Sequence, residues 1–477
     1  MKKYLLIAMM LISSVSCSDF LVLQPENQIS ENTFYQTAND FNTALVGAYA
    51  GLQDLHNASI LDLGELITDN LEIQWTSPEV SEMECDQANI TSTNVYVSSV
   101  WSNCFTIVSR CNNILARIDN VSFDANLKSQ YKGEALFLRA YCYFYLVRFF
   151  GDVPIVKQKF SSPEEIAAFD MTRKPAADAY ALIIDDLQNS ATLLANMTTL
   201  KKERASTGAA KTLLGKVYLT QKDYTKSAAV LKEVIDLNKY TLAVNYKTLF
   251  SGNNSNLGET IFEIRYLSGN LGEGNGFSSL FTPGLFNMAL FPGNMNGSGR
   301  MDPTMDIYNS YETGDLRKAA SIGYPVPLTN GQTQNLTYGI KFVDFTTGVP
   351  GDGGVNFTSL RYADVILMYA EALNETGKTI EAHPYLNQIR TRAGLPILSG
   401  LGKADFALAL EKERRVEFLY EGQRWFDLVR TGRTQTVINK HFADKGLTFK
   451  VEPYELLMPI PQGEIYINPK LTQNTGY

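Results

Sequence analysis

The chain has few of the residues that build metal centres and disulfide frameworks. Its 477 residues include three His and five Cys, and no two Cys are spaced as Cys-x-x-Cys. So little His and Cys argues against a structural zinc protein and against a fold held together by disulfides. We therefore expect no metal ion and no other cofactor.

An excess of positive charge is also missing. The sequence has 42 Lys and Arg against 50 Asp and Glu, which gives a net charge of -8. Proteins bind nucleic acid largely by neutralising phosphates with Lys and Arg, so nucleic acid is not an expected partner. The 45% content of hydrophobic residues is that of a globular protein. The length indicates roughly three structural units or one large composite fold.

Long apolar runs are absent beyond the N-terminus. Residues 1–16 comprise a basic pair, an apolar stretch and four small or apolar residues, and Cys17 follows directly. This pattern is typical of a secretory signal, too short to span a bilayer. We predict that residues 1–16 are removed and that Cys17 carries lipid, whose acyl chains anchor the protein to a membrane. The alternative is an ordinary signal with a Cys beside it by chance.

The other four cysteines lie at positions 85, 104, 111 and 142, three of them in apolar helical context. Free Cys in such surroundings behaves as a small hydrophobic residue. We expect buried thiols, although an exported protein could also form a bridge.

Apolar residues recur at three- and four-residue steps over much of the chain, which predicts helices. The expected helices cover residues 39–55, 100–118, 131–149, 178–194, 207–219, 224–237, 364–374, 379–391, 405–420 and 424–430.

Two helical hairpins share a tetratricopeptide-like register. In this pattern, small residues lie where two helices touch, and large apolar residues lie beside them. The first hairpin places Gly215, Tyr218, Ser227, Leu231 and Val234 in the register, and the second places Ala370, Leu373, Ala382, Leu386 and Ile389 there. Such hairpins cannot bury their faces alone, so the helices should stack. The sequence predicts a mainly α fold whose helix-pair scaffold is interrupted by inserted material.

The inserted material runs from residue 251 to 359. It is rich in Gly, Asn, Ser, Thr, Pro and aromatic residues, and only residues 261–266 have the character of a strand. Long irregular segments inside compact proteins are usually functional or disordered, and the many aromatic residues favour function. The expected organisation is a signal at 1–16, a helical region at 18–250, a loop-rich insertion with short strands at 251–359 and a second helical region at 360–477.

Seven sequence blocks resemble those of the SusD/RagB family. The blocks occur in family order between residue 17 and residue 477 and are found at 133–154, 360–365, 370–374, 386–395, 413–418, 424–430 and 458–477. The resemblance implies tetratricopeptide-like helix pairs decorated by irregular loops, which agrees with the hairpins described above.

The resemblance also implies a function. Members of this family are surface lipoproteins that bind nutrients, chiefly glycans. The chain would be lipid-anchored in the outer membrane, facing the cell exterior and touching the membrane through its lipid alone. Its expected partners are an oligosaccharide and a SusC-like TonB-dependent transporter that receives it, and no catalysis is expected. Two alternatives remain: a surface glycosidase that uses paired carboxylates, and a family member that binds peptide or another non-sugar nutrient.

Several charged and aromatic residues within the blocks are expected to be structural. Glu134, Arg139, Arg361 and Asp364 lie in largely apolar helical segments. They should form buried ion pairs, because an unpaired buried charge is costly. Trp101 and Trp425 should lie in the core.

Trp75 is the leading candidate for ligand contact. It follows Asp69, Asn70 and Gln74 in a segment where the helical pattern fails. Proteins bind sugars by stacking flat aromatic rings on their apolar faces and by forming hydrogen bonds from polar side chains to their hydroxyls. The resemblance places sugar-binding surfaces on this early segment and on the insertion. Further candidates in the insertion are Phe291, Asn294, Asn296, Arg300, Tyr308, Tyr324 and Tyr338.

Overall fold

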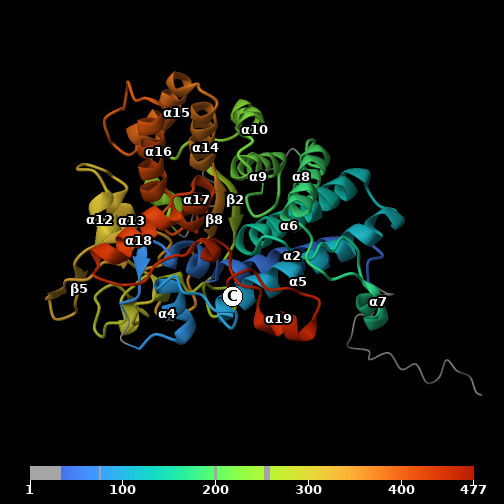
Figure 1. Cartoon of the computed structure of the whole chain (residues 1–477), viewed down its shortest axis with the longest axis horizontal. Coiled ribbons are helices and arrows are strands. Elements are labelled where there is room, and N and C mark those ends of the chain that lie inside the picture. Colours follow the sequence, from blue (N-terminus) through green and yellow to red (C-terminus); the bar gives the residue numbers. More distant parts are fainter. Residues whose placement is uncertain (1–33, 58, 75–76, 198–200, 252–257) are drawn as a thin grey trace, which may run out of the picture.

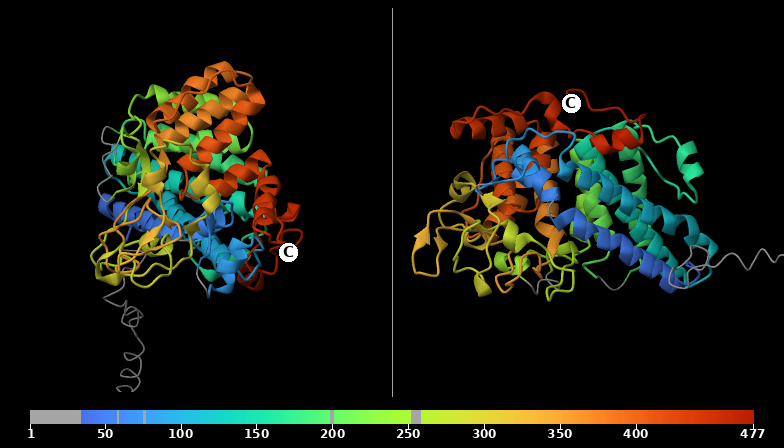
Figure 2. Two further views of the ribbon diagram at one scale, coloured as in Figure 1. Left: turned by 90° about the vertical axis from the view of Figure 1, so that its left-hand side faces the viewer. Right: turned by 90° about the horizontal axis from the view of Figure 1, so that it is seen from below.

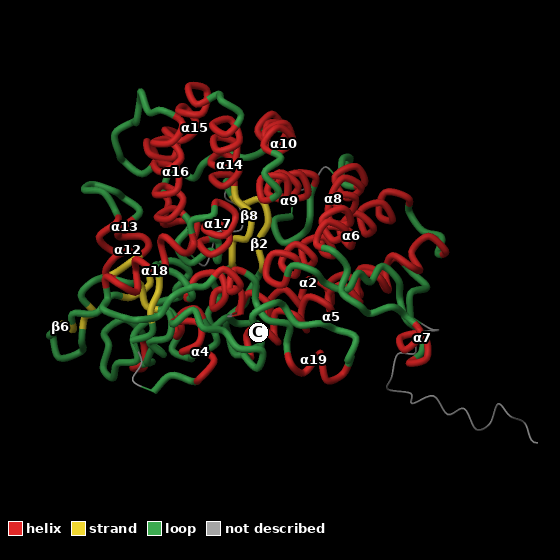
Figure 3. Tube along the Cα trace, viewed as in Figure 1, coloured by secondary structure: helices red, strands yellow, loops and turns green. Residues whose placement is uncertain are grey.

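The computed structural model describes residues 34–57, 59–74, 77–197, 201–251 and 258–477. Cys17 and Trp75, two residues singled out from the sequence, lie outside this part of the chain. Helices dominate, and a loop-rich region lies beside them (Figures 1 and 3). The fold is mainly α, as the sequence predicts. None of the described helices combines the length and apolar character needed to cross a bilayer.

Four long helices of the N-terminal half form one packed group: α2 (Ala38–Asn57), α5 (Val95–Arg117), α6 (Ala125–Phe150) and α8 (Ala176–Leu193). They confirm the four helices expected there. From Tyr131 to its C-terminal end, helix α6 is buried on nearly every side, which is typical of a helix at the centre of a large core. Its Arg139 donates hydrogen bonds to Asp186 of α8 at 2.7 and 2.8 Å. Shorter helices in this half are α3 (Ser59–Leu61), the π-helix η2 (Asp62–Leu66), α4 (Val80–Asp86) and α7 (Pro163–Ala168).

The two predicted hairpins are α9 (Thr207–Thr220) with α10 (Tyr224–Asp236), and α14 (Tyr362–Glu375) with α15 (Thr379–Arg392). Ser227 donates a hydrogen bond to the carbonyl oxygen of Gly215 at 2.9 Å, so the first pair touches where the register predicts. Helix α10 packs against α14, which brings the two hairpins together in space although they are far apart in sequence (Figure 1).

The C-terminal helices are α16 (Lys403–Glu417), α17 (Arg424–Thr431), α18 (Thr434–Asp444) and α19 (Gln462–Ile467). The first two were expected from the sequence. Helices α4, α7, α18 and α19 were not, and three of these four are a single turn or two long. Helix α18 matters most, since it forms one wall of the candidate site described below.

The insertion consists largely of loops with short helices and strands, and it lies to one side of the helical scaffold (Figure 2). Its helices are α11 (Phe277–Leu280), α12 (Met305–Ser310) and α13 (Lys318–Ser321). The described strands are β1 (Leu71–Glu72), β2 (Thr260–Ile264), β3 (Asp302–Pro303), β4 (Ile322–Gly323), β5 (Val326–Pro327), β6 (Thr333–Gln334), β7 (Tyr338–Gly339) and β8 (Phe357–Arg361). They pair antiparallel as β1–β3, β2–β8, β4–β7 and β5–β6. Strand β2 confirms the strand expected at residues 261–266.

A sealed cluster of ion pairs, called the inner cluster, fixes the insertion to the helices. Arg361 at the end of β8 contacts Glu417 of α16 at 2.6 Å and Glu421 at 2.8 Å. Arg317 of the insertion contacts Glu417 at 2.9 Å. The members of this cluster are Glu259, Arg317, Arg361, Arg392, Glu413, Glu417 and Glu421, with side chains 0 to 5% exposed. Because each charge has a partner, the cluster tolerates its burial.

The other residues expected to be structural are also buried and paired. Glu134 contacts Arg204 at 2.5 Å, and Asp364 contacts Lys216 at 2.7 Å. The expectation of buried ion pairs is therefore confirmed. Trp101 and Trp425 are 3% and 1% exposed and belong to the core. Cys85, Cys104, Cys111 and Cys142 are buried free thiols, as expected.

Candidate functional site

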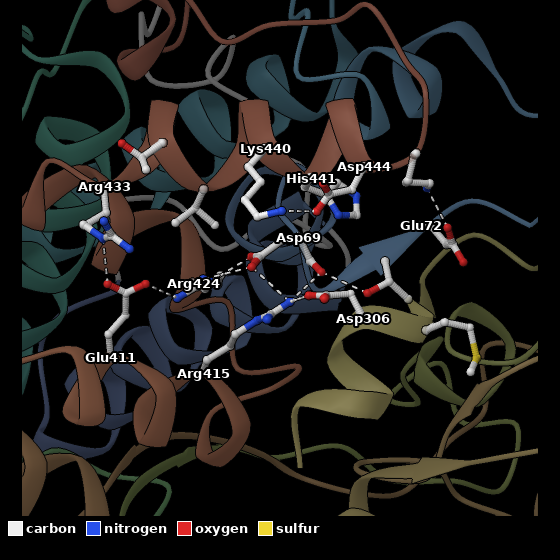
Figure 4. Close-up of a pocket in the computed structure, with 15 residues that line it drawn as sticks. Asp69, Glu72, Asp306, Glu411, Arg415, Arg424, Arg433, Lys440, His441 and Asp444 are labelled. Carbon is white, nitrogen blue, oxygen red and sulfur yellow. Dashed lines mark hydrogen bonds and ion pairs between the residues drawn. The ribbon is translucent and has the colours of Figure 1, made fainter. Parts of the chain in front are cut away.

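A cavity of about 450 Å³, lined mainly by charged residues, opens where the early segment, the insertion and the C-terminal helices meet (Figure 4). The early segment contributes Asp69 and Glu72, and the insertion contributes Thr304, Met305 and Asp306. The C-terminal helices and their flanks contribute Glu411, Arg415, Arg424, Arg433, Thr436, Val437, Lys440, His441, Asp444 and Lys445. No aromatic ring other than the imidazole of His441 lines this cavity within the described part of the chain.

Helix periodicity explains how α18 forms a wall of the cavity. Its lining residues are 436, 437, 440, 441, 444 and the following residue 445, which recur every three or four positions on one face. The opposite face buries Ile438 and Phe442 in the core. Glu411 and Arg415 are four residues apart on α16 and therefore lie on one face as well.

Asp69 lies at the base of the cavity and holds two arginines. Its carboxylate accepts hydrogen bonds from Arg424 at 2.8 and 2.9 Å, and Arg415 lies 3.0 Å away. Burial would raise the pKa of Asp69, but the two guanidinium groups outweigh it and lower the pKa to about 2. Asp69 is therefore a fixed negative charge at neutral pH.

The remaining charges around the cavity are also paired. Glu411 contacts Arg433 at 3.0 Å, Asp444 contacts Lys440 at 2.6 Å, and Glu72 contacts Lys445 at 2.7 Å. Asp306 contacts Arg415 at 2.6 Å. These ion pairs, together with those of Asp69, form the outer cluster. They surround the cavity with groups that can accept and donate hydrogen bonds to a polar ligand.

His441 presents its ring to the cavity between these charges (Figure 4). Burial lowers the pKa of His441, and the positive charge of Lys445 lowers it further. The imidazole is therefore neutral at neutral pH and offers both a donor and an acceptor. Among the described residues, no group of three or more His, Cys, Asp or Glu is placed to hold a metal ion.

Backbone pairing brings the early segment and the insertion side by side. Strand β1 pairs with β3, with Leu71 opposite Pro303 and Glu72 opposite Asp302. The backbone N–H of Gln74 donates to the carbonyl oxygen of Gly299 at 2.8 Å. The two segments that the sequence singled out for ligand contact are thus joined through their backbones, and Trp75 directly follows Gln74 in the chain.

Three of the residues proposed from the sequence are held by partners within the protein: two are buried, and the side chain of the third, Arg300, is 14% exposed. Asn70 is 1% exposed, donates to Glu65 at 2.7 Å and accepts from Arg415 at 2.8 Å. Arg300 donates to Asp62 at 2.6 and 2.7 Å. Phe291 is 8% exposed and stacks on the ring of Phe345. Asn70 thereby supports Arg415 of the cavity, whereas Arg300 and Phe291 contact residues that do not line it.

The other insertion candidates are more accessible. Tyr324 is 38% exposed, and its ring centroid lies 5.3 Å from that of Tyr308. Tyr338 is half-buried and lies against Gly323, where a Cβ atom would come within 2.1 Å of the ring, so this position requires glycine. Asn296 is partly exposed. The backbone of Asn294 ends a short 3₁₀-helix, and its side chain lies outside the described residues.

Most of the cavity lining was not anticipated from the sequence. Asp69 was named, but Arg415 and Arg424 were not, and both are more than 340 residues away in the chain. No local pattern reveals such a contact. Helix α18 could have been predicted from the sequence, because Val437, Ile438 and Phe442 have the spacing of a helix with one buried side.

Comparisons with known proteins identify this class of helix-pair protein. The model of the SusD family matches residues 320–477, and a second family model, described as "Starch-binding associating with outer membrane", matches residues 19–219. The chain belongs to the SusD-like family. SusD-like protein P2 of Formosa agariphila is 27% identical over the full length of both chains.

Solved structures agree with this assignment. A SusD superfamily protein from Bacteroides vulgatus has 25% identity and a TM-score of 0.80, with 93% of this chain and 100% of that chain covered. A structure described as a laminarin binding SusD-like protein has 27% identity and a TM-score of 0.78, with coverages of 92% and 99%. Surface glycan-binding protein A from Bacteroides fluxus has 25% identity and a TM-score of 0.79, with coverages of 92% and 100%.

Proposed function

We propose that this protein is a cell-surface lipoprotein that binds oligosaccharides and delivers them to a SusC-like TonB-dependent transporter. Lipid on Cys17 would anchor it in the outer membrane, facing the exterior. The description of the second family model supports an outer-membrane association. The printed names of two structural neighbours, one for laminarin and one for surface glycans, support a carbohydrate ligand.

The observation that carries the proposal is the position of the cavity. It lies beside the β1–β3 pairing, where the early segment bearing Trp75 meets the insertion. Sugars present many hydroxyl groups and small apolar faces. Fixed, paired charges suit the hydroxyls, and an aromatic ring, a role that we assign to Trp75, would suit the faces.

Within this site we assign Trp75 the stacking role, with Gln74 and Asp69 as hydrogen-bonding partners. Gln74 is half-buried and directly precedes Trp75. Among the described residues, its side-chain N–H groups make only long contacts of 3.4 Å, to Glu72 and to Thr337. Tyr324, Asn296 and Asn294 would extend the contact across the insertion. Asn70, Arg300 and Phe291 would act by supporting the loops that carry these residues.

The electrostatics favour binding over hydrolysis. A glycosidase needs one carboxyl group that stays protonated near neutral pH and a second that is ionised. Asp69, the most buried acid of the cavity, has a pKa of about 2 because two arginines hold it ionised. Asp69 therefore cannot serve as the general acid of such a pair.

The first test is Trp75→Ala in the mature protein, with calorimetry against laminarin and soluble starch. Loss of the stacking ring should weaken binding by about 1 kcal/mol or more, roughly fivefold, with no loss of fold. Tyr466→Ala is the matched control, since Tyr466 is 77% exposed on α19 and does not line the cavity. Unchanged affinity in Trp75→Ala would remove Trp75 from the site. Conversion of the bound oligosaccharide by the purified protein would contradict a purely binding role.

The anchor and the partner need a separate test in cells. Cys17→Ala should move the protein from the membrane fraction to the soluble fraction, because the acyl chains supply the membrane affinity. The wild-type protein should co-purify with a TonB-dependent transporter after mild solubilisation. Membrane retention of the Cys17→Ala protein would contradict the lipid anchor.

A further inference from the structure

The charges around the cavity cancel. Of its lining side chains, five are acidic and five are basic. All ten take part in ion pairs with one another, at distances from 2.6 to 3.6 Å. His441 adds no charge at neutral pH, because burial lowers its pKa. The cavity as a whole therefore presents no spare cation.

An anionic sugar needs a cation that is free to receive it. A carboxylate or sulfate is bound best by a guanidinium or ammonium group in a direct, charge-assisted contact. Here Arg415 and Arg424 are already held by the buried Asp69, and Arg433 is held by Glu411. At Arg415 and Arg424 an anion would have to displace the buried carboxylate of Asp69 and leave it unpaired, which is costly.

The net charge of the whole molecule also disfavours the binding of anionic ligands. The net charge is -8, and removal of residues 1–16 takes away Lys2 and Lys3, so the mature chain carries 40 - 50 = -10. A negative protein repels polyanions at long range and slows their association. Uncharged polysaccharides are not affected by this field.

We propose that the cavity selects uncharged oligosaccharides and rejects those that carry carboxylate or sulfate groups. This inference rests on the proposed glycan-binding function and specifies its substrate class. Ion-paired side chains still have lone pairs and N–H groups that can bind hydroxyls, and neutral His441 adds a donor and an acceptor.

Two acids at the rim set this selectivity. Asp306 and Asp444 have side chains 59% and 62% exposed, whereas Asp69 is 5% exposed. Asp306 neutralises Arg415, and Asp444 neutralises Lys440. The side chain of Arg415 is 12% exposed and that of Lys440 is 71% exposed, so an anion that approaches either base meets the negative charge of Asp306 or Asp444 beside it.

The first experiment measures the wild-type mature protein in detergent by calorimetry at physiological salt. The neutral probes are laminarin and soluble starch, and the anionic probes are polygalacturonate and chondroitin sulfate. At least one neutral probe should bind ten times more tightly than either anionic probe. Equal or tighter binding of an anionic probe would overturn the inference. Binding of no probe of either class would instead contradict the proposed function, and the inference with it.

The second experiment tests whether the rim acids are responsible. The double variant Asp306→Asn/Asp444→Asn should gain at least tenfold in affinity for polygalacturonate, because Arg415 and Lys440 lose a counter-ion. The control is Asp170→Asn/Asp236→Asn, which changes the net charge equally at two exposed ion pairs that do not line the cavity. An equal gain in the control, or no gain in the cavity variant, would contradict the role of Asp306 and Asp444.

Discussion

The inner and outer clusters use the same chemistry in different surroundings. Both consist of basic side chains paired with carboxylates, and both join the insertion or the early segment to the C-terminal helices. In the inner cluster the side chains are 0 to 5% exposed. In the outer cluster exposure ranges from 5% at Asp69 to 71% at Lys440.

The difference in burial gives the two clusters different tasks. A sealed ion pair has lost its hydration and depends on its partner, so removal of one member is severely destabilising. A solvated pair loses little when it is broken. The inner cluster therefore fixes the fold, whereas the exposed pairs of the outer cluster, such as Asp444 with Lys440, can exchange contacts with a ligand without endangering it.

The largest expected effect is that of Glu417→Ala in the inner cluster. Glu417 contacts Arg317 at 2.9 Å and Arg361 at 2.6 Å, and it also binds Arg392. Its loss leaves buried guanidinium groups without compensation and should lower the free energy of unfolding by about 3–5 kcal/mol. Urea denaturation followed by circular dichroism measures this change.

The matched variant in the outer cluster is Asp444→Asn. Its partner Lys440 is 71% exposed, and the two residues are one helical turn apart. The change in the free energy of unfolding should be within about 0.5 kcal/mol. Similar losses in both variants would show that burial does not distinguish the clusters.

The pH dependence of stability tests the effect of burial on a single carboxyl group, that of Glu65, which lies between the inner and outer clusters. Burial raises the pKa of Glu65 to about 7, although its side-chain hydrogen bond from Asn70 acts against the shift. Because the folded pKa lies above the unfolded value, the contribution of Glu65 to stability is present below pH 4.5. It is lost as the pH rises through 7, by roughly 3 kcal/mol.

Glu65→Gln should remove this part of the pH dependence. Asp62 and Asp86, whose pKa values are raised to about 6 by burial, remain in both proteins. The wild type minus variant difference in the free energy of unfolding between pH 4.5 and 8 therefore isolates Glu65. A difference that does not change with pH would contradict the buried, neutral state of this residue.

A last comparison concerns the helix pairs of the scaffold. A Cβ atom at Gly215 would lie 2.5 Å from Leu231, so Gly215→Val should destabilise the protein by about 1–3 kcal/mol. At Gly47 of α2 nothing lies within 4 Å of a Cβ atom, so Gly47→Ala should stabilise by about 0.5–1 kcal/mol. Thermal unfolding compares them, and the same sign for both would contradict the close contact at Gly215.

Much of the scaffold could be predicted from the sequence. Helices α9, α10, α14 and α15 were expected within one or two residues of their observed ends. Their apolar periodicity is local, and Gly215 and Ser227 mark the helix contact through their small size. Helix α18 was missed although its apolar residues have helical spacing, because its exposed face is unusually polar and charged.

The candidate site could be predicted only in part. Asp69 was named because polar residues precede Trp75 in a segment without helical pattern. Its partner Arg424 lies 355 residues away and sits within a block that reads as scaffold. Residues such as Asn70 and Arg300 have the chemistry of ligand contacts, but their burial depends on Glu65, Arg415 and Asp62, which only folding brings near.

The sequence by itself determined the helical scaffold, its interruption by a loop-rich segment and the family to which the chain belongs. These features follow from periodicity and short motifs, which act over a few helical turns. Only the tertiary structure decided which charges are sealed and which are open, and that the early segment meets α12 and α18 around one cavity. Ion pairing and burial depend on distances between residues hundreds of positions apart, and no local pattern encodes them.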